Sequence, residues 1–193
     1  MQETYYEETT TLRNYKAEKT KHIIINVLSI ISFVCAAIFA MLIYFNFDWR
    51  FGNLLLNIVI LLSVLAIFIA GGILLGVLKN KFCVEYDYIF INGTINIDKV
   101  IKGAKRKAQI EFSTSNILKI GKFCSDEYYK ITSDNLIGVK IYTSNDEPIE
   151  NKDFYYILIS RGNEKTICVV ECTRQFIINL VKFSNKTVVE KGL

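Results

Sequence analysis

Two long uncharged apolar runs, separated by a short polar segment, constrain the fold of this chain more than any other feature. The first run covers residues 23–45 and the second covers residues 54–78, and neither contains Asp, Glu, Lys or Arg. As α-helices, each run would be roughly 35 Å long, which is enough to cross a hydrocarbon layer of about 30 Å. One charge in the middle of such a helix would cost about 2.5–3.5 kcal/mol on insertion. The sequence therefore predicts a transmembrane helical hairpin.

The positions of lysine and arginine predict how this hairpin is oriented. Basic residues stand on the outer side of both runs: Arg13, Lys16, Lys19 and Lys21 before the first, and Lys79 and Lys81 after the second. The connecting segment 46–53 contains only Arg50, which Asp48 offsets. Because basic flanks stay on the cytoplasmic side, we predict a multi-pass protein of the cell (inner) membrane with both termini in the cytoplasm. The lipid bilayer is then its first partner.

Small residues recur at four-residue spacing inside the predicted helices. Ala36 and Ala40 do so in the first helix, and Gly72 and Gly76 do so in the second. This spacing lets helix backbones approach closely. Since the connection is short, we predict that these faces pack on each other within the hairpin. Dimerisation through Gly72 and Gly76 is the alternative, so a homo-oligomer or an unidentified membrane protein partner stays open.

Residues 1–22, which precede the first run, carry no steady apolar period. They mix Glu, Thr, Tyr and Lys, and their four basic and four acidic residues balance. Such a composition favours disorder or a weak helix. We predict an N-terminal cytoplasmic lead without a fixed structure.

From residue 82 onward the apolar period changes from that of a helix to that of a strand. Tyr86, Tyr88 and Phe90 alternate with polar residues before Asn92-Gly93, a dipeptide typical of a two-residue type I′ hairpin turn. The hairpin register would place Phe90 opposite Ile95 and Tyr88 opposite Ile97. It would also place Asp87 opposite Asp98 on the other face, where we predict a solvated pair.

The rest of the segment 82–193 predicts further short strands and one helix. In the third strand, 105–112, Ala108, Ile110 and Phe112 share the apolar face. The other predicted strands cover residues 117–123, 136–143, 154–160 and 165–171. Thr173 is placed as the N-cap of a final helix, whose apolar stripe is Phe176, Ile177, Leu180 and Val181. The fold class is thus a membrane α-helical hairpin plus a mainly-β domain, a seven-strand antiparallel barrel or sandwich capped by a C-terminal helix.

The order of these elements over residues 82–185 resembles the pleckstrin-homology-like (PH-like) fold. The whole chain is similar to an uncharacterised family of small two-span bacterial membrane proteins. The segments that carry this resemblance are Glu85-Tyr86-Asp87-Tyr88, Asn92-Gly93, Ile97-Asp98-Lys99 and Lys105-Arg106-Lys107. The resemblance implies architecture only, because the family has no established activity. PH-like folds often bind lipid headgroups or peptides, but the short Asn92-Gly93 loop argues against inherited phosphoinositide binding.

No pattern in the chain predicts catalysis. The segment 82–193 contains no histidine, G-x-S-x-G, Walker A loop or G-x-G-x-x-G, and none of the five cysteines are spaced C-x-x-C. We therefore predict no enzyme, no cofactor and no metal site, although three cysteines including Cys168 and Cys172 are a conceivable zinc set. The near balance of basic and acidic residues in segment 82–193 excludes a nucleic-acid-binding domain.

One basic cluster after the second strand is a candidate for anionic lipid headgroups. The cluster begins at Lys99, and its candidate headgroup residues are Lys102, Lys105, Arg106 and Lys107. Near an anionic leaflet each such side chain contributes roughly 1 kcal/mol of attraction, and a solvated basic turn is the alternative. We predict a non-enzymatic membrane protein that presents a binding or scaffold domain at the inner leaflet. The rival interpretation is an accessory subunit of a membrane enzyme or transporter complex.

Overall fold

A computed structural model describes residues 4–46, 54–101, 104–133, 136–162, 164–184 and 189–190. The chain divides into two compact units. One consists of Met1–Arg13 together with Val84–Leu193, and the other consists of Asn14–Cys83. The second unit is therefore inserted in the sequence of the first.

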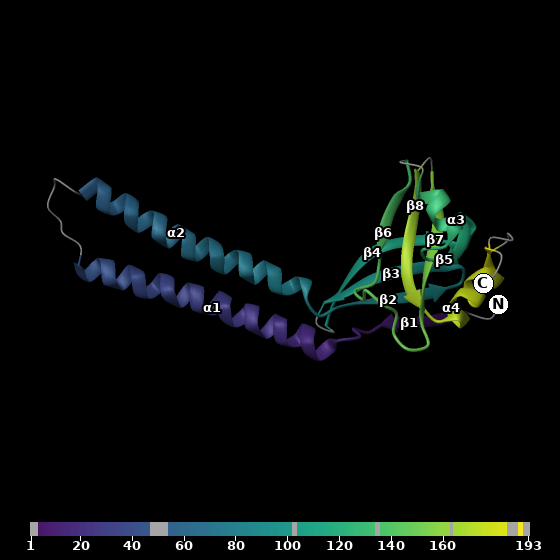
Figure 1. The fold of residues 1–193 in the computed structure, drawn as a ribbon, viewed down its shortest axis with the longest axis horizontal. Helices are drawn as coiled ribbons and strands as arrows, with labels where there is room; N and C mark the ends of the chain where they lie inside the picture. The colour runs from purple at the N-terminus through teal and green to yellow at the C-terminus, as the bar shows by residue number, and fades with distance from the viewer. Residues whose placement is uncertain are drawn as a thin grey trace. The chain divides into compact units, whose positions relative to one another are not determined.

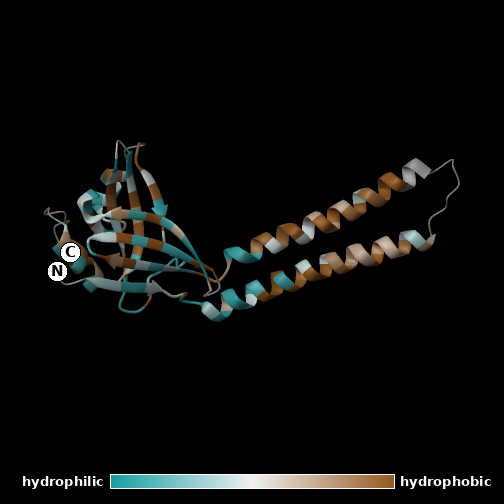
Figure 2. Ribbon diagram, turned by 180° about the vertical axis from the view of Figure 1, so that it is seen from behind, coloured by the Kyte–Doolittle hydropathy of each residue, from teal (hydrophilic) through white to brown (hydrophobic). Residues whose placement is uncertain are grey.

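The inserted unit contains two long helices. Helix α1 covers Tyr15–Asn46, helix α2 covers Leu54–Leu78, and a 3₁₀ turn, η1, follows at Lys79–Lys81. The stretches Tyr15–Leu42 and Ile58–Lys81 are long and apolar enough to cross a membrane, judged by length and composition. Apolar residues follow one another along both helices (Figure 2). Helix α1 begins well before the predicted span, so residues 15–22 of the predicted lead are helical.

Two serine side chains of α1 donate hydrogen bonds to backbone carbonyl groups of α2. Ser29 Oγ donates to the carbonyl oxygen of Gly72 (2.8 Å), and Ser32 Oγ donates to that of Phe68 (2.7 Å). At the η1 end, Lys79 Nζ donates to Asn26 Oδ1 at 2.7 Å. The polar side chains of the first run, Asn26, Ser29 and Ser32, therefore lie at the contact between the helices.

The domain unit consists of two four-stranded sheets, followed by a short helix (Figure 1). The first sheet has the order β1-β2-β3-β4, with β1 at Tyr5–Thr10, β2 at Val84–Ile91, β3 at Thr94–Ile101 and β4 at Lys105–Ser113. The second sheet has the order β5-β7-β8-β6, with β5 at Ile117–Lys122, β6 at Gly138–Ile141, β7 at Asp153–Arg161 and β8 at Glu164–Cys172.

Strand β1 corrects the prediction of a lead without fixed structure, and it makes eight strands instead of seven. It pairs antiparallel with β2 in the register Tyr6↔Phe90 and Thr10↔Tyr86. No apolar alternation marks this segment, because the more buried side of β1 contains Glu8 and Thr10 as well as Tyr6. These polar side chains have partners that only the fold supplies.

Strand β6 corrects the prediction of an entirely antiparallel domain. It pairs parallel with β8, in the register Lys140↔Cys168. Strand β7 runs antiparallel to β8 and lies on its other side. β6 and β7 therefore run in opposite directions on the two sides of β8.

The first predicted hairpin is confirmed, with one exception about its outer face. Asn92 and Gly93 have φ values of 48° and 85°, as a type I′ turn requires. Phe90 pairs with Ile95, and Asp87 pairs with Asp98. However, Asp87 is only 2% exposed, so the predicted solvated pair is wrong for that residue.

A β-bulge changes which residues of β4 face the core. Ile97 of β3 pairs with Ile110, but the next residue, Asp98, pairs with Ala108 and so skips Gln109. Ile110 and Phe112 are buried as predicted, whereas Ala108 is exposed, contrary to the prediction. Past the bulge the alternation is reversed, so Arg106 lies on the outer side of the sheet.

Side chains from the inner faces of both sheets form the main core. Helix α4, Arg174–Phe183, adds Phe176, Ile177 and Leu180 to it. The hydroxyl of Thr173 accepts a hydrogen bond from the backbone N–H of Phe176 at 3.3 Å and caps this helix. A smaller cluster on the other face of the second sheet contains Tyr128 of helix α3, which covers Asp126–Thr132.

Candidate functional site

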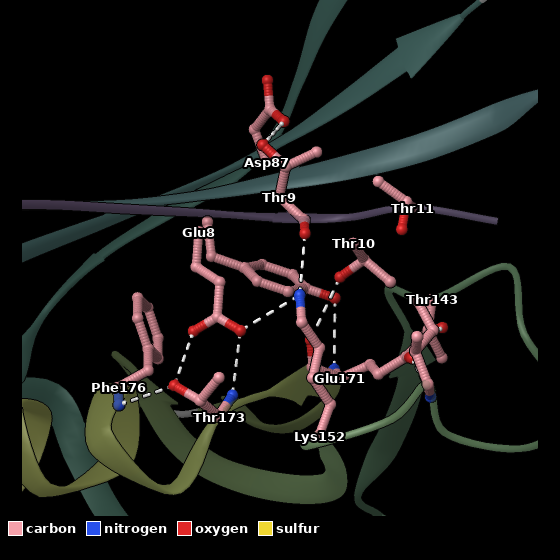
Figure 3. Close-up of polar contacts among 12 residues, drawn as sticks. Glu8, Thr9, Thr10, Thr11, Asp87, Thr143, Lys152, Glu171, Thr173 and Phe176 are labelled. Carbon is pink, nitrogen blue, oxygen red and sulfur yellow. Dashed lines mark hydrogen bonds and ion pairs between the residues drawn. The ribbon is translucent and has the colours of Figure 1, made fainter. Parts of the chain in front are cut away.

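The densest polar cluster of the domain fastens β1 to β8 and to the segment between β6 and β7. We call it the N-terminal clamp, and its members are Glu8, Thr10, Lys152, Glu171 and Thr173 (Figure 3). Three segments that are distant in the sequence contribute to it. Its hydrogen bonds show whether its polar groups have partners within the protein or are left to bind a ligand.

Glu8 lies at the centre of one half of the clamp. Its carboxylate is 3.0 Å from Lys152 Nζ, and these two side chains are only 9% and 14% exposed. The backbone N–H and the hydroxyl of Thr173 donate to its two oxygens at 2.9 and 3.0 Å. Lys152 Nζ also donates to the carbonyl oxygen of Thr9 at 2.7 Å. Both oxygens of Glu8 therefore have donors from the protein.

Glu171 lies at the centre of the other half and is completely buried. Its Oε2 accepts from Thr143 Oγ1 at 2.6 Å and from Asn145 Nδ2 at 2.8 Å. Its Oε1 accepts from the backbone N–H of Ile149 at 2.9 Å. These neutral donors replace the water that burial removes, so Glu171 pins the segment between β6 and β7 to β8.

Tyr88 connects the clamp to the core. Its hydroxyl donates to the carbonyl oxygen of Tyr142 at 2.5 Å and accepts from the N–H of Glu171 at 3.2 Å. Burial raises the pKa of the Tyr88 hydroxyl far above its ordinary value, so it remains a donor at any physiological pH. Thr10 Oγ1 donates to the carbonyl oxygen of Glu171 at 3.0 Å and joins β1 to the same point.

The chemistry of the clamp is structural. Glu8, Thr10, Glu171 and Thr173 use their polar groups on one another or on neighbouring protein groups. Burial raises the pKa of the Cys168 thiol to about 12, so this cysteine is a poor nucleophile at neutral pH. Within the described part of the chain, no three His, Cys, Asp or Glu side chains are grouped to hold a metal ion.

The structure separates the members of the predicted basic cluster. Lys102 lies outside the described residues. The Arg106 guanidinium is 3.0 Å from Asp87 Oδ2 and 3.4 Å from Glu7 Oε1, so it balances a buried carboxylate. Lys105 and Lys107 are exposed, and the bulge turns them to the opposite side of β4 from Arg106. Arg106 therefore does not share a surface with Lys105 and Lys107.

The predicted helix-packing residues lie as follows. Ala36 is 6% exposed, and Ala40 is half-buried. A Cβ on Gly72 would lie 2.8 Å from the Phe33 ring, and one on Gly76 would lie 3.6 Å from Ser29 Oγ. Both glycines thus face α1.

Sequence reasoning missed the clamp except for Thr173, which it placed as a helix cap. The available signal was Glu8 and Thr10 at alternate positions, which suits a strand. Nothing in the sequence pairs Glu8 with Lys152 or Glu171 with Asn145, because those contacts depend on the arrangement of both sheets.

Comparison with known proteins identifies a family and nothing more specific. No curated protein and no solved structure gives a significant match to the chain. A family described as "Bacterial PH-like domain (DUF6106)" matches residues 2–190. The matched range includes β1 and both apolar helices as well as the two sheets. The chain therefore belongs to this family of bacterial PH-like domains, whose function is unknown.

Proposed function

We propose that the protein is a non-enzymatic, membrane-anchored binding or scaffold module, in which α1 and α2 cross the membrane and the PH-like domain lies in the cytoplasm. One observation carries this proposal. Thr10 of β1 and Tyr86 of β2 are register partners, and the helical hairpin lies between them in the sequence. Since both ends of the hairpin return to one sheet, the chain between them must cross a bilayer an even number of times. Two helices provide two crossings.

The surface of the helices supports the membrane assignment. Large apolar side chains are exposed along both, including Met41 at 65%, Leu62 at 60% and Ile67 at 69%. A contiguous apolar surface of this extent is unfavourable in water, and a bilayer would cover it. The contacts between the helices use small and hydroxyl side chains, as is typical of helices packed in lipid.

The cytoplasmic orientation is supported by charge and by the cysteines. Lys16, Lys19 and Lys21 lie in the first turns of α1, and Lys79 and Lys81 follow α2. All five cysteines are free thiols, which suits a reducing compartment. A binding role is supported by the family, because PH-like domains are generally binding modules without catalysis. Lys102, Lys105 and Lys107 remain candidates to contact anionic headgroups.

Thiol labelling in intact bacterial cells tests the topology. With Cys124 replaced by Ser, a cysteine at Asp48 should react with a membrane-impermeant maleimide, and a cysteine at Glu147 should react only after lysis. Glu147 is suitable because its side chain is 72% exposed. Asn145 is unsuitable because its amide group bonds to Glu171 and to Thr11. Reaction at Glu147 but not at Asp48 in intact cells would reverse the orientation, and release by alkaline carbonate would exclude the membrane span.

A further inference from the structure

We propose that Lys99, Lys107 and Lys140, which we call the inward lysine cluster, bind a phosphate group beside Tyr86 and Tyr142. The inference rests on the proposed function only in treating the domain as a binding module, and it does not require the membrane span. Phosphate is the shared chemistry of two sources, a soluble phosphate compound and a phospholipid headgroup. The predicted headgroup residues did not include Lys140, and Lys99 belonged only to the wider basic cluster.

The first part of the cluster is a row of side chains across the first sheet. Tyr86 of β2 pairs with Lys99 of β3, and Lys99 pairs with Lys107 of β4. Tyr86 packs against the core, so this row lies on the inner face of the sheet. The bulge at Gln109 is what places Lys107 in it, since unbroken pairing from Ile110 would have placed Ala108 opposite Lys99.

The second part comes from the other sheet. Lys140 of β6 pairs with Cys168, a fully buried member of the core, so Lys140 also occupies an inward-facing position. Tyr142 follows two residues later, about 7 Å along the strand. The rings of Tyr142 and Tyr86 lie with their centroids 6.1 Å apart and join the two sheets at this point. Lys99 is thus the register partner of one tyrosine of this pair, and Lys140 lies two residues from the other.

The charges of the cluster have no counter-ion from the described part of the protein. Five basic side chains of the domain form ion pairs with described residues, whereas others, including Lys130 and Lys165, form none there; the five are Arg13, Arg106, Lys119, Lys122 and Lys152. Lys99, Lys107 and Lys140 form none with any residue that the structure describes. The carboxylate of Asp87 lies on the outer face, where Arg106 already pairs with it. Like charges directly opposite on neighbouring strands are destabilising, so Lys99 and Lys107 hold unfavourable energy that an anion would relieve.

A simpler role for lysines on a sheet edge is to prevent pairing with other strands. Strands β4 and β6 are edge strands, so that role would account for Lys107 and Lys140. It does not account for Lys99, because β3 lies inside its sheet between β2 and β4. The pairing of Lys99 with Lys107 is what favours a ligand over edge protection.

Tyrosine hydroxyls complete a site suited to phosphate. Phosphate oxygens accept hydrogen bonds and carry more than one negative charge, so they match ammonium groups combined with neutral O–H donors. Tyr142 is 5% exposed, and burial raises the pKa of its hydroxyl to about 12. It is therefore protonated and able to donate at neutral pH.

The test uses the full chain in phosphatidylcholine nanodiscs, with the midpoint of thermal unfolding of the domain as readout. Pyrophosphate at low ionic strength should raise the midpoint of the natural protein more than KCl of equal ionic strength does. The variant Lys99→Gln/Lys107→Gln should lose this difference. Without phosphate the same variant should melt above the natural protein, because the like-charge pair is gone. The matched control Lys130→Gln/Lys165→Gln removes the same charge from exposed positions and should behave like the natural protein.

A second arm distinguishes the two sources of phosphate. If nanodiscs containing phosphatidylglycerol raise the midpoint through Lys99 and Lys107 but pyrophosphate does not, the ligand is a lipid headgroup. The reverse result identifies a soluble phosphate compound. Tyr142→Phe, which keeps the ring, should lower the affinity for phosphate about tenfold. A given midpoint shift should then need about ten times more ligand. No response in either arm, or an equal response in Lys99→Gln/Lys107→Gln, would overturn the proposal whatever thiol labelling shows.

Discussion

Lys152 Nζ lies 3.0 Å from Glu8 Oε1, and this ion pair joins the first strand of the chain to the residue just before β7. Both side chains are nearly buried, so neither charge can return to water while the fold is intact. The same carboxylate also accepts hydrogen bonds from the backbone N–H and the hydroxyl of Thr173, the residue that caps α4. One side chain of β1 thus secures two later parts of the domain.

Replacing Glu8 with Ala should lower the free energy of unfolding by about 2–4 kcal/mol, because a nearly buried Lys152 loses its counter-ion and Thr173 loses its acceptor. Chemical denaturation of the detergent-solubilised protein measures the change. Glu147→Ala is the matched control. It removes an exposed carboxylate that pairs with Arg13 and should cost no more than about 1 kcal/mol. Equal effects of the two changes would contradict the role assigned to Glu8.

Replacing Arg106 with Gln should also destabilise the domain, although Arg106 itself is partly exposed. Asp87 is 2% exposed and would keep the hydroxyl of Thr9, at 2.8 Å, as a partner but lose the guanidinium. We expect a loss of about 1–3 kcal/mol, and Asp87→Asn in the same chain should restore part of it because the unpaired charge is gone. Lys105→Gln should change stability little. If Asp87→Asn fails to restore any stability, the loss does not come from the buried carboxylate.

Gly72 and Gly76 should differ in their tolerance of a side chain. A Cβ on Gly72 would meet the Phe33 ring at 2.8 Å, whereas one on Gly76 stays at an ordinary distance of 3.6 Å from Ser29 Oγ. We expect Gly72→Val to separate the helices and Gly76→Ala to leave them paired. Oxidative cross-linking between cysteines placed at Ser29 and Gly76 measures this pairing, and it should fall only when Gly72→Val is added. An unchanged yield would show that the helices do not depend on close approach at Gly72.

The buried Cys168 thiol predicts a loss of stability in alkali. Its folded-state pKa, about 12, lies above the ordinary value of 9.0, because burial disfavours the thiolate. The stabilisation that comes from this pKa difference is therefore complete below pH 9.0 and is lost as pH rises toward about 12. Over that range the free energy of unfolding falls by up to about 1.4 kcal/mol per pH unit. The stability difference between the natural protein and Cys168→Ala should shrink between about pH 8 and pH 11. A difference that stays constant over this range would contradict the role given to burial of Cys168.

The elements that the sequence predicted well are those whose signal is local. The Asn92-Gly93 turn and the pairing of Tyr88 with Ile97 follow from residues next to one another in the chain. The bulge at Gln109 has no such signal, so Ala108 was placed on the wrong face. Strand β1 was missed for a different reason. Its inward residues Glu8 and Thr10 are polar, and their partners come from segments that only the folded domain brings near.

The pairing of β1 with β2 has a consequence for biosynthesis. Strand β1 leaves the ribosome first, but its partner appears only after both long helices have been made. The first sheet therefore cannot assemble during the early part of translation, and residues 5–10 must wait in an unpaired state. If the helices cross a bilayer as proposed, a chain that inserts only one of them leaves β1 and β2 on opposite sides. The domain can then be completed only when membrane insertion was correct. A chain that failed to insert both helices keeps an unpaired sheet edge, which quality-control proteases can reach.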